Sequence, residues 1–118
     1  MAMRLQSWQF TMAPQCLLEI HFEVKRERHR EFTQSLESFR AVRAPGQLSV
    51  SVYGDNSATD QYFWVEEWPD DHFLESYVVS DGFRAVLGYL RTLGPLISCR
   101  IVGPDVPEKL RNSNRRIH

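Results

Sequence analysis

The 118-residue sequence predicts one α+β domain whose elements follow in the order β-α-β-β-α-β. Three observations lead to this fold class. Segments with strand-like alternation of apolar residues are interleaved with segments of helix-like spacing. Turn-forming residues stand at the boundaries between them. The composition, 42% hydrophobic and 25% charged, is typical of a folded chain rather than a disordered one.

The first half of the chain predicts a strand, a helix and a second strand. Residues 17–24 alternate between apolar and polar side chains, a period of two that favours a strand with one buried face. Residues 27–43 have helical spacing, and the Pro45-Gly46 pair ends that helix. Its buried side is predicted to consist of Phe32, Leu36, Phe39 and Val42. Residues 48–53 alternate again and predict the second strand.

The middle of the chain predicts a hairpin. A polar turn at residues 55–60 follows the second strand. Residues 61–68 then form the third strand, with aromatic and branched side chains on both faces.

The last part of the chain predicts a broken helix and a final strand. Pro69-Asp70-Asp71 is typical of a helix start, because carboxylates are favourable at the positive end of the helix dipole. Ser80-Asp81-Gly82 marks a break, after which helical spacing resumes until Gly94-Pro95. Residues 96–102 form the last strand.

This order is the ferredoxin-like sandwich, in which two helices cover one side of a four-stranded antiparallel sheet and leave the other side open. Phe63 and Val65 are expected on the open side, beside Leu17 and several polar groups. A surface of this mixed character is usually covered by another subunit, so the sequence predicts a homodimer that packs sheet on sheet.

The ends of the chain are predicted to lie outside this domain. Residues 17–103 form the domain, residues 1–16 an N-terminal extension and residues 104–118 a basic, solvated tail. The formal net charge of −1 argues against nucleic acid as a partner. No apolar run is long enough for a membrane span, and the first residues do not form a signal peptide. A soluble, cytoplasmic protein is therefore expected.

Cysteine and histidine give little sign of a metal or redox site. Cys16 and Cys99 are expected to be small buried side chains, with a bridge or a reactive thiol as the alternatives. The histidines have no metal-binding spacing, and no metal is predicted. His21 is expected at the dimer interface or in solvent, and His72 is expected to be exposed.

One set of residues resembles the antibiotic biosynthesis monooxygenase (ABM) domain over roughly residues 17–102. The set combines the turn before the second strand with a Glu-x-Trp motif and three spaced residues behind it. Its members are Pro45-Gly46, Glu66-x-Trp68, Tyr77, Ser80 and Phe83. The resemblance implies a dimeric α/β barrel with a pocket between sheet and helices. Characterised members include quinol monooxygenases and enzymes that oxidise aromatic polyketides with molecular oxygen and no cofactor.

The resemblance also implies which residues form the site. Strand alternation places Tyr62, Trp64, Glu66 and Trp68 on one face, which the family assigns to the pocket, and Tyr77 and Phe83 would close over it from the helices. Ile20, on the first strand, is a further candidate for ligand contact. Such a cavity suits a flat aromatic molecule. Glu66 would accept a proton if burial raises its pKa, and Tyr77 would donate a hydrogen bond to the developing oxyanion.

Structural roles remain open for the same residues. Trp64 and Trp68 are alternatively core side chains, and Tyr77 is alternatively a core tyrosine. Glu66 alternatively pairs with Arg84 or Arg91 across the seam between helices and sheet.

The sequence also departs from the characterised branches of the family. Haem-degrading members have Asn, Trp and His at positions that hold Ile20, Tyr77 and Leu87 here, so the axial ligand is absent. Quinol-oxidising members often have His in place of Tyr77, and the polyketide branch has Asn in place of Trp64. The sequence therefore favours a cofactor-independent monooxygenase acting on a phenolic or quinol-like small molecule. The alternative is a non-catalytic dimeric module of the same fold that binds or senses a ligand, and a haem-related or isomerase-type activity is a third hypothesis.

Overall fold

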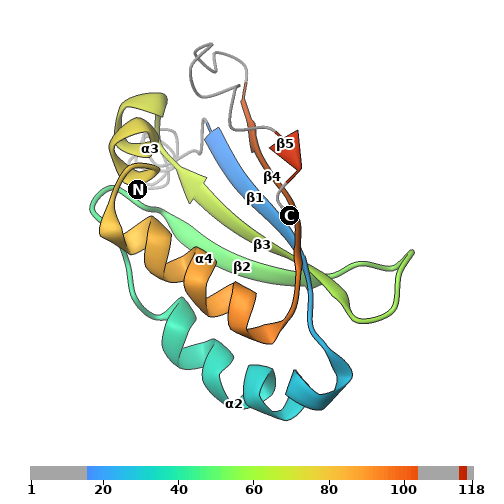
Figure 1. The fold of residues 1–118 in the computed structure, drawn as a ribbon. Helices are drawn as coiled ribbons and strands as arrows, with labels where there is room; N and C mark the ends of the chain where they lie inside the picture. The colour runs from blue at the N-terminus through green and yellow to red at the C-terminus, as the bar shows by residue number, and fades with distance from the viewer. Residues whose placement is uncertain (1–15, 104–114, 117–118) are drawn as a thin grey trace, which may run out of the picture.

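The computed structural model describes residues 16–103 and 115–116 of the chain. In chain order the elements are β1 (Cys16–Glu23), the 3-10 turn η1 (Arg26–Arg28), α2 (His29–Arg40), β2 (Ser49–Gly54), β3 (Gln61–Trp68), α3 (Asp71–Tyr77), α4 (Asp81–Leu93), β4 (Leu96–Val102) and β5 (Arg115–Arg116). The sheet has the order β2-β3-β1-β4-β5, and all its pairs are antiparallel. Its first four strands have the ferredoxin-like arrangement, which confirms the predicted fold class (Figure 1).

The helices α2 and α4 lie on one face of this sheet, and the core fills the space between (Figure 1). On β1 the alternate residues Leu18, Ile20 and Phe22 are fully buried toward the helices. The residues between them are only partly covered. The period of two in the sequence therefore corresponds to a real division into an inner and an outer face.

The first helix is shorter than its apolar spacing suggests. Residues 26–28 form a 3-10 turn, and α2 ends at Arg40 rather than Arg43. Phe32 is buried and Phe39 packs on the core, but Val42 is 70% exposed because it follows the end of the helix. The prediction that Val42 belongs to the buried stripe is wrong.

The predicted break in the second helical segment is confirmed. Asp70 caps α3, and its carboxylate accepts a hydrogen bond from the backbone N–H of Phe73 over 3.1 Å. Ser80 caps α4 in the same way by accepting from the N–H of Phe83 over 3.3 Å. Each cap satisfies a backbone donor that a helix start leaves without a partner, so the chain forms two helices at an angle instead of one.

The outer face of the sheet carries Phe63 and Val65 of β3 beside Leu17 of β1, as predicted. With Tyr53 and neighbouring polar groups they line a shallow hollow of about 340 Å³. The ion pair between Arg100 and Glu19, 2.6 Å apart, lies beside this hollow. His21 stacks on Phe63 with a centroid distance of 4.4 Å. The homodimer remains a prediction.

The two ends of the domain differ slightly from their predicted bounds. Strand β1 begins at Cys16, which the sequence places in the N-terminal extension. The predicted tail contains β5, whose two residues pair with Ser98 and Cys99 of β4. An edge strand offers N–H and C=O groups for such pairing. The rest of the extension and tail, residues 1–15, 104–114 and 117–118, lies outside the described residues.

Two smaller expectations concern the cysteines and the membrane. Cys16 and Cys99 are both buried, as expected. None of the helices in the described ranges has the length and apolar character needed to cross a membrane.

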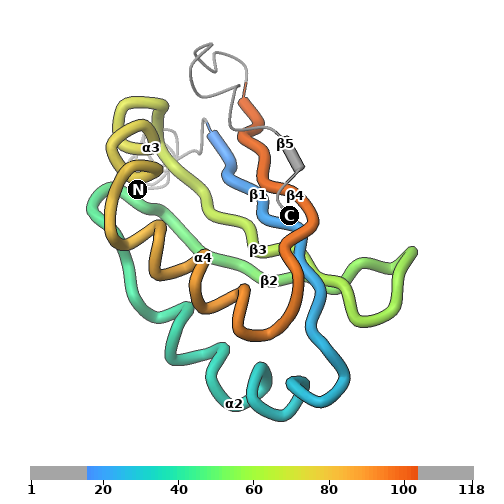
Figure 2. The backbone as a smooth tube through the Cα atoms, viewed as in Figure 1, coloured from blue at the N-terminus to red at the C-terminus, as the bar shows by residue number. Residues whose placement is uncertain are grey.

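Figure 2 shows the path of the backbone, with the loop between β2 and β3 extending past the end of the sheet.

Candidate functional site

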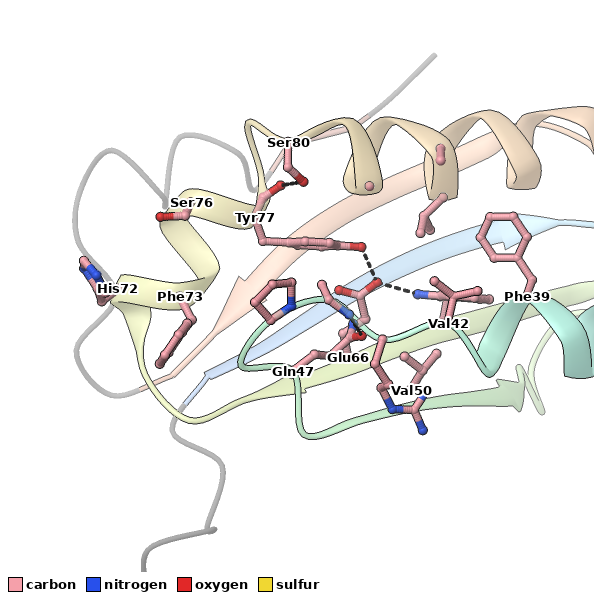
Figure 3. Close-up of a pocket in the computed structure, with 17 residues that line it drawn as sticks. Phe39, Val42, Gln47, Val50, Glu66, His72, Phe73, Ser76, Tyr77 and Ser80 are labelled. Carbon is pink, nitrogen blue, oxygen red and sulfur yellow. Dashed lines mark hydrogen bonds between the residues drawn. The ribbon is translucent and has the colours of Figure 1, made fainter.

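A cavity of about 780 Å³ lies between the inner face of the sheet and the helices. It is bounded by β2 and β3 on one side, and by the end of α2, α3 and the start of α4 on the other (Figure 3). The residues that line it are Phe39, Val42, Arg43, Ala44, Pro45, Gln47, Val50, Trp64, Glu66, His72, Phe73, Ser76, Tyr77, Ser80, Gly82, Ala85 and Val86. Its size is in the range of small-molecule sites.

The walls of the cavity are mainly apolar and aromatic. Phe39 meets the edge of Trp64 with a centroid distance of 6.0 Å, and Phe39 is itself stacked on Tyr89 at 4.2 Å. The hydroxyl of Tyr89 is 2.7 Å from the Ser35 hydroxyl, so this stack is fixed at its outer end. A rigid aromatic wall of this kind fits a flat aromatic ligand.

Glu66 is the buried polar group of the cavity. Strand β3 directs Glu66 inward because its neighbours Val65 and Glu67 occupy the outer face. In the sheet it stands between Leu18 of β1 and Val50 of β2, both buried. Glu66 has no exposed surface and is the one buried charged residue in the described part of the chain.

Three side chains donate hydrogen bonds to the Glu66 carboxylate. The Trp64 indole Nε1 donates to Oε2 over 2.8 Å, and the Tyr77 hydroxyl donates to the same oxygen over 2.9 Å. The Trp68 indole Nε1 donates to Oε1 over 3.3 Å. Figure 3 shows the Tyr77 hydroxyl directed at the carboxylate from α3. The site thus surrounds an acid with neutral donors.

Gln47 lines the cavity beside Glu66 and lowers its pKa. Its own Oε1 accepts from the backbone N–H of Ala44 over 3.1 Å, which leaves the amide group to face the carboxylate. The turn that carries Gln47 includes Gly46, whose φ is +84°. A Cβ at Gly46 would lie 2.5 Å from the ring of Phe73, so this turn and α3 pack closely at the cavity. Sequence reasoning identified the Pro-Gly turn but missed Gln47 and Phe73.

The electrostatics of the site depend on the burial of Glu66 and on the neutral side chains that donate hydrogen bonds to it. Desolvation raises the pKa of Glu66, and the hydrogen bonds from Trp64, Tyr77, Trp68 and Gln47 act in the opposite direction. Burial and the nearby Glu66 charge raise the pKa of Tyr77. The same two causes raise the pKa of the Cys99 thiol to about 11. Tyr77 and Cys99 are therefore neutral at ordinary pH.

The alternative that Glu66 pairs with an arginine is wrong. Arg84 instead pairs with Asp81 on the surface, at 2.6 Å, and Arg91 is exposed. The hydrogen-bond donors described above take the place of the expected ion pair.

The structure brings three of the predicted site residues together at the cavity: Trp64, Glu66 and Tyr77. Trp68 lies behind them, fully buried, with its ring 4.7 Å from that of Tyr77. Phe83 packs against Tyr77 from α4, with a centroid distance of 5.4 Å. Trp68 and Phe83 thus support the site without lining the cavity.

Tyr62 and Ile20 lie elsewhere in the core. Tyr62 faces inward as predicted, but it packs against Phe22 and Phe32 near the other end of the sheet. Ile20 is fully buried beneath the helices, and neither residue is among those that line the cavity.

Metal-ligating side chains do not gather at the site. Within residues 16–103 and 115–116, no group of three His, Cys, Asp or Glu is placed to hold a metal ion. His72 is exposed at the cavity, as expected. His21 lies on the outer face, with Nε2 3.1 Å from the Asp55 carboxylate.

A comparison with known protein families gives a match to this chain. The family described as antibiotic biosynthesis monooxygenase (ABM) matches residues 17–88. The chain belongs to the ABM family.

Solved structures share the fold. A conserved protein from Methanosarcina mazei Go1 has 20% identity and a TM-score of 0.60, covering 84% of this chain and 99% of its own. A Bordetella bronchiseptica protein, provisionally assigned as an antibiotic biosynthesis monooxygenase, has 16% identity and a TM-score of 0.62, covering 80% and 100%. MupZ from Pseudomonas fluorescens has 16% identity and a TM-score of 0.60, covering 82% and 75%. At these identities the likeness is one of fold. A comparison with curated proteins finds no match.

Proposed function

We propose that this chain is a cofactor-independent monooxygenase that oxidises a phenolic or quinol-like aromatic small molecule with molecular oxygen. Membership of the ABM family makes a monooxygenase reaction a reasonable starting point. The observation that carries the proposal is Glu66, a buried carboxyl group without a cationic partner, joined to the phenol of Tyr77 at an aromatic cavity.

The reaction requires little from the protein. A phenol and O₂ give a quinone and water: one oxygen atom becomes the new carbonyl, and the other leaves as water with the two hydrogens that the phenol loses. The site must hold the ring, accept the phenolic proton and keep water away from the reacting pair.

The residues of the cavity match these requirements. Trp64 and Phe39 offer aromatic surface for the ring. The Glu66 carboxylate is the proton acceptor, and its raised pKa brings it closer to that of the donor. Tyr77 lies between the carboxylate and the ligand as the contact residue.

The test is oxygen consumption with a panel of naphthols and hydroquinones, after subtraction of the rate without protein. We expect saturable uptake with at least one compound, with release of the quinone from a naphthol or the hydroxyquinone from a hydroquinone, one atom of O₂ entering the product and the other leaving as water. A matched variant, Val86→Phe, places a larger side chain in the cavity wall and should abolish uptake while the protein stays folded. Uptake that persists in Val86→Phe, or no uptake with any member of the panel, contradicts the proposal.

A second candidate is a non-catalytic dimeric module that binds or senses the same class of ligand. It is favoured by one observation: the Glu66 carboxylate has no exposed surface and already accepts hydrogen bonds from Trp64, Tyr77 and Trp68, so a ligand does not contact it directly. Saturable quenching of tryptophan fluorescence by an aromatic ligand, without oxygen uptake, would support this function instead.

A further inference from the structure

The Glu66 carboxylate is buried and its Oε2 is occupied. An ionised carboxylate has about two acceptor positions on each oxygen and no donor. Trp64 and Tyr77 both donate to Oε2, Trp68 donates to Oε1, and the carboxylate has no exposed surface. A ligand in the cavity therefore meets the Tyr77 hydroxyl, not the carboxylate, as its polar contact.

The direction of the Tyr77 hydroxyl depends on the charge of Glu66. While Glu66 is ionised, the single Tyr77 hydrogen is held by Oε2 at 2.9 Å, and the phenol oxygen can only accept from a ligand. Once Glu66 carries a proton, it must donate. Of the three groups within hydrogen-bond distance of the carboxylate, the indole N–H groups of Trp64 and Trp68 cannot accept. The Tyr77 oxygen is the acceptor that remains, so its own hydrogen turns toward the cavity.

We propose that the Glu66–Tyr77 pair makes the cavity select ligands by hydrogen-bond polarity: it takes hydroxylated aromatics when Glu66 is ionised, and aromatics that only accept hydrogen bonds when Glu66 is protonated. This deepens the proposed function, on which it depends for the cavity as the substrate site. A phenol that transfers its proton to the Tyr77 oxygen, while the Tyr77 proton passes to Oε2, leaves a protein in the form that binds a carbonyl. Substrate and quinone product are thus each matched to one protonation state.

Other titratable groups near Glu66 would not produce this pH-dependent difference between the two kinds of ligand. Tyr77 on α3 and Cys99 on β4 stay neutral because burial raises the pKa of each. Arg43, after α2, keeps its charge at all ordinary pH values. His72, at the start of α3, is exposed, and it acts equally on uncharged ligands of either polarity.

The experiment compares 1-naphthol, which donates, with 1-methoxynaphthalene, which only accepts. Dissociation constants are measured without oxygen by tryptophan quenching between about pH 5 and pH 8. We expect 1-methoxynaphthalene to lose about tenfold in affinity relative to 1-naphthol as the pH rises through the Glu66 transition. A tenfold change corresponds to about 1.4 kcal/mol, which is the size of one net hydrogen bond. The His72→Gln variant should keep the same pH-dependent difference between the two ligands, whatever its effect on the affinity for both.

Two variants and one calorimetric measurement make the result decisive. Tyr77→Phe should bind both ligands with similar affinity, and Glu66→Gln should lose the pH dependence. In wild-type protein, titration in two buffers of different ionisation enthalpy should show proton uptake with 1-methoxynaphthalene and none with 1-naphthol above the Glu66 transition; this arm needs no variant to fold.

Equal pH dependence for the two ligands, proton uptake with both, or no saturable binding of either overturns the inference. Because these are binding measurements, naphthol selectivity without oxygen uptake would refute the proposed monooxygenase and leave the polarity selection intact.

Discussion

The Trp64 indole and the Glu66 carboxylate are joined by a 2.8 Å hydrogen bond, although both belong to one strand. Residues two positions apart on a strand share a face, so β3 supplies both the acid and its strongest neutral donor. A carboxylate held from its own strand needs no cation to remain in the core. Its pKa is set by two opposing influences: burial raises it, and the hydrogen-bond donors lower it.

The pH dependence of stability should report the Glu66 pKa. Its folded pKa is raised above the ordinary value of 4.5, so the unfolded chain releases this proton first as the pH rises. The unfolded state then binds fewer protons than the folded state, and the free energy of unfolding falls from about pH 4.5 until the folded pKa is passed. Urea unfolding across this range should show that fall in wild-type protein and lack it in Glu66→Gln. Parallel pH profiles for the two proteins would show that Glu66 has no raised pKa.

Gly46 should tolerate no side chain. Alanine there would adopt a left-handed backbone conformation and meet the Phe73 ring, so Gly46→Ala should lower the free energy of unfolding by about 1–3 kcal/mol. Gly88 in α4 is the matched control, because a Cβ there meets nothing and Gly88→Ala should raise stability by about 0.5–1 kcal/mol. Chemical denaturation of the two variants measures both effects. A neutral Gly46→Ala would argue against the close packing of this turn on α3.

A homodimer should form through the outer face of the sheet. The wild type should sediment at twice the 13.8 kDa of one chain. Val65→Glu adds a charge to the outer face and should give monomers, because a buried charge without a partner is strongly unfavourable. Gln34→Lys, on the exposed side of α2, is the control that should stay dimeric. A wild-type monomer at micromolar concentration would exclude this assembly.

Haem should not bind with a defined stoichiometry. Leu87, at the position of the axial histidine in haem-degrading relatives, packs against the core and cannot ligate iron. Titration with haemin should give no sharp Soret band that saturates at one equivalent per chain. Such a band would mean that another side chain supplies the ligand.

The two tryptophans of the site should differ in ligand binding. Trp64 lines the cavity and Trp68 does not, so Trp64→Leu should weaken the binding of a planar aromatic by about 1–3 kcal/mol. Trp68→Phe keeps an aromatic ring beside Tyr77 and should have a smaller effect on affinity. Fluorescence quenching by 1-naphthol, using the tryptophans that remain in each variant, gives the comparison. The opposite order would place the ligand deeper than the cavity.

The element order and the inward face of β3 could be predicted from the sequence, because apolar period and turn residues are local properties. The position of the cavity along that face could not. Tyr62 and Trp64 share the face, yet Tyr62 packs on Phe22 and Phe32 where α2 covers the sheet. Which part of the face stays uncovered depends on where α2 ends, and that helix stops before Val42.

Gln47 shows a second limit of the sequence. Its contact with Glu66 depends on the turn at Gly46 and on the bond from Ala44, which arise only when the loop packs on the domain. Side chains in loops have no periodicity from which their direction could be predicted. Arg84 illustrates the converse error, since its charge suggested a partner for Glu66, but Asp81 lies one helical turn away.

The alternation of β3 has an evolutionary consequence. Trp64 and Glu66 line the cavity and Trp68 lies behind them, while Phe63, Val65 and Glu67 form the opposite surface. Substitutions at alternate positions of the strand can therefore change the cavity and the outer face of the sheet separately. Insertion of one residue within the strand would turn the cavity residues to the outer face and the outer residues toward the cavity, and selection should remove it.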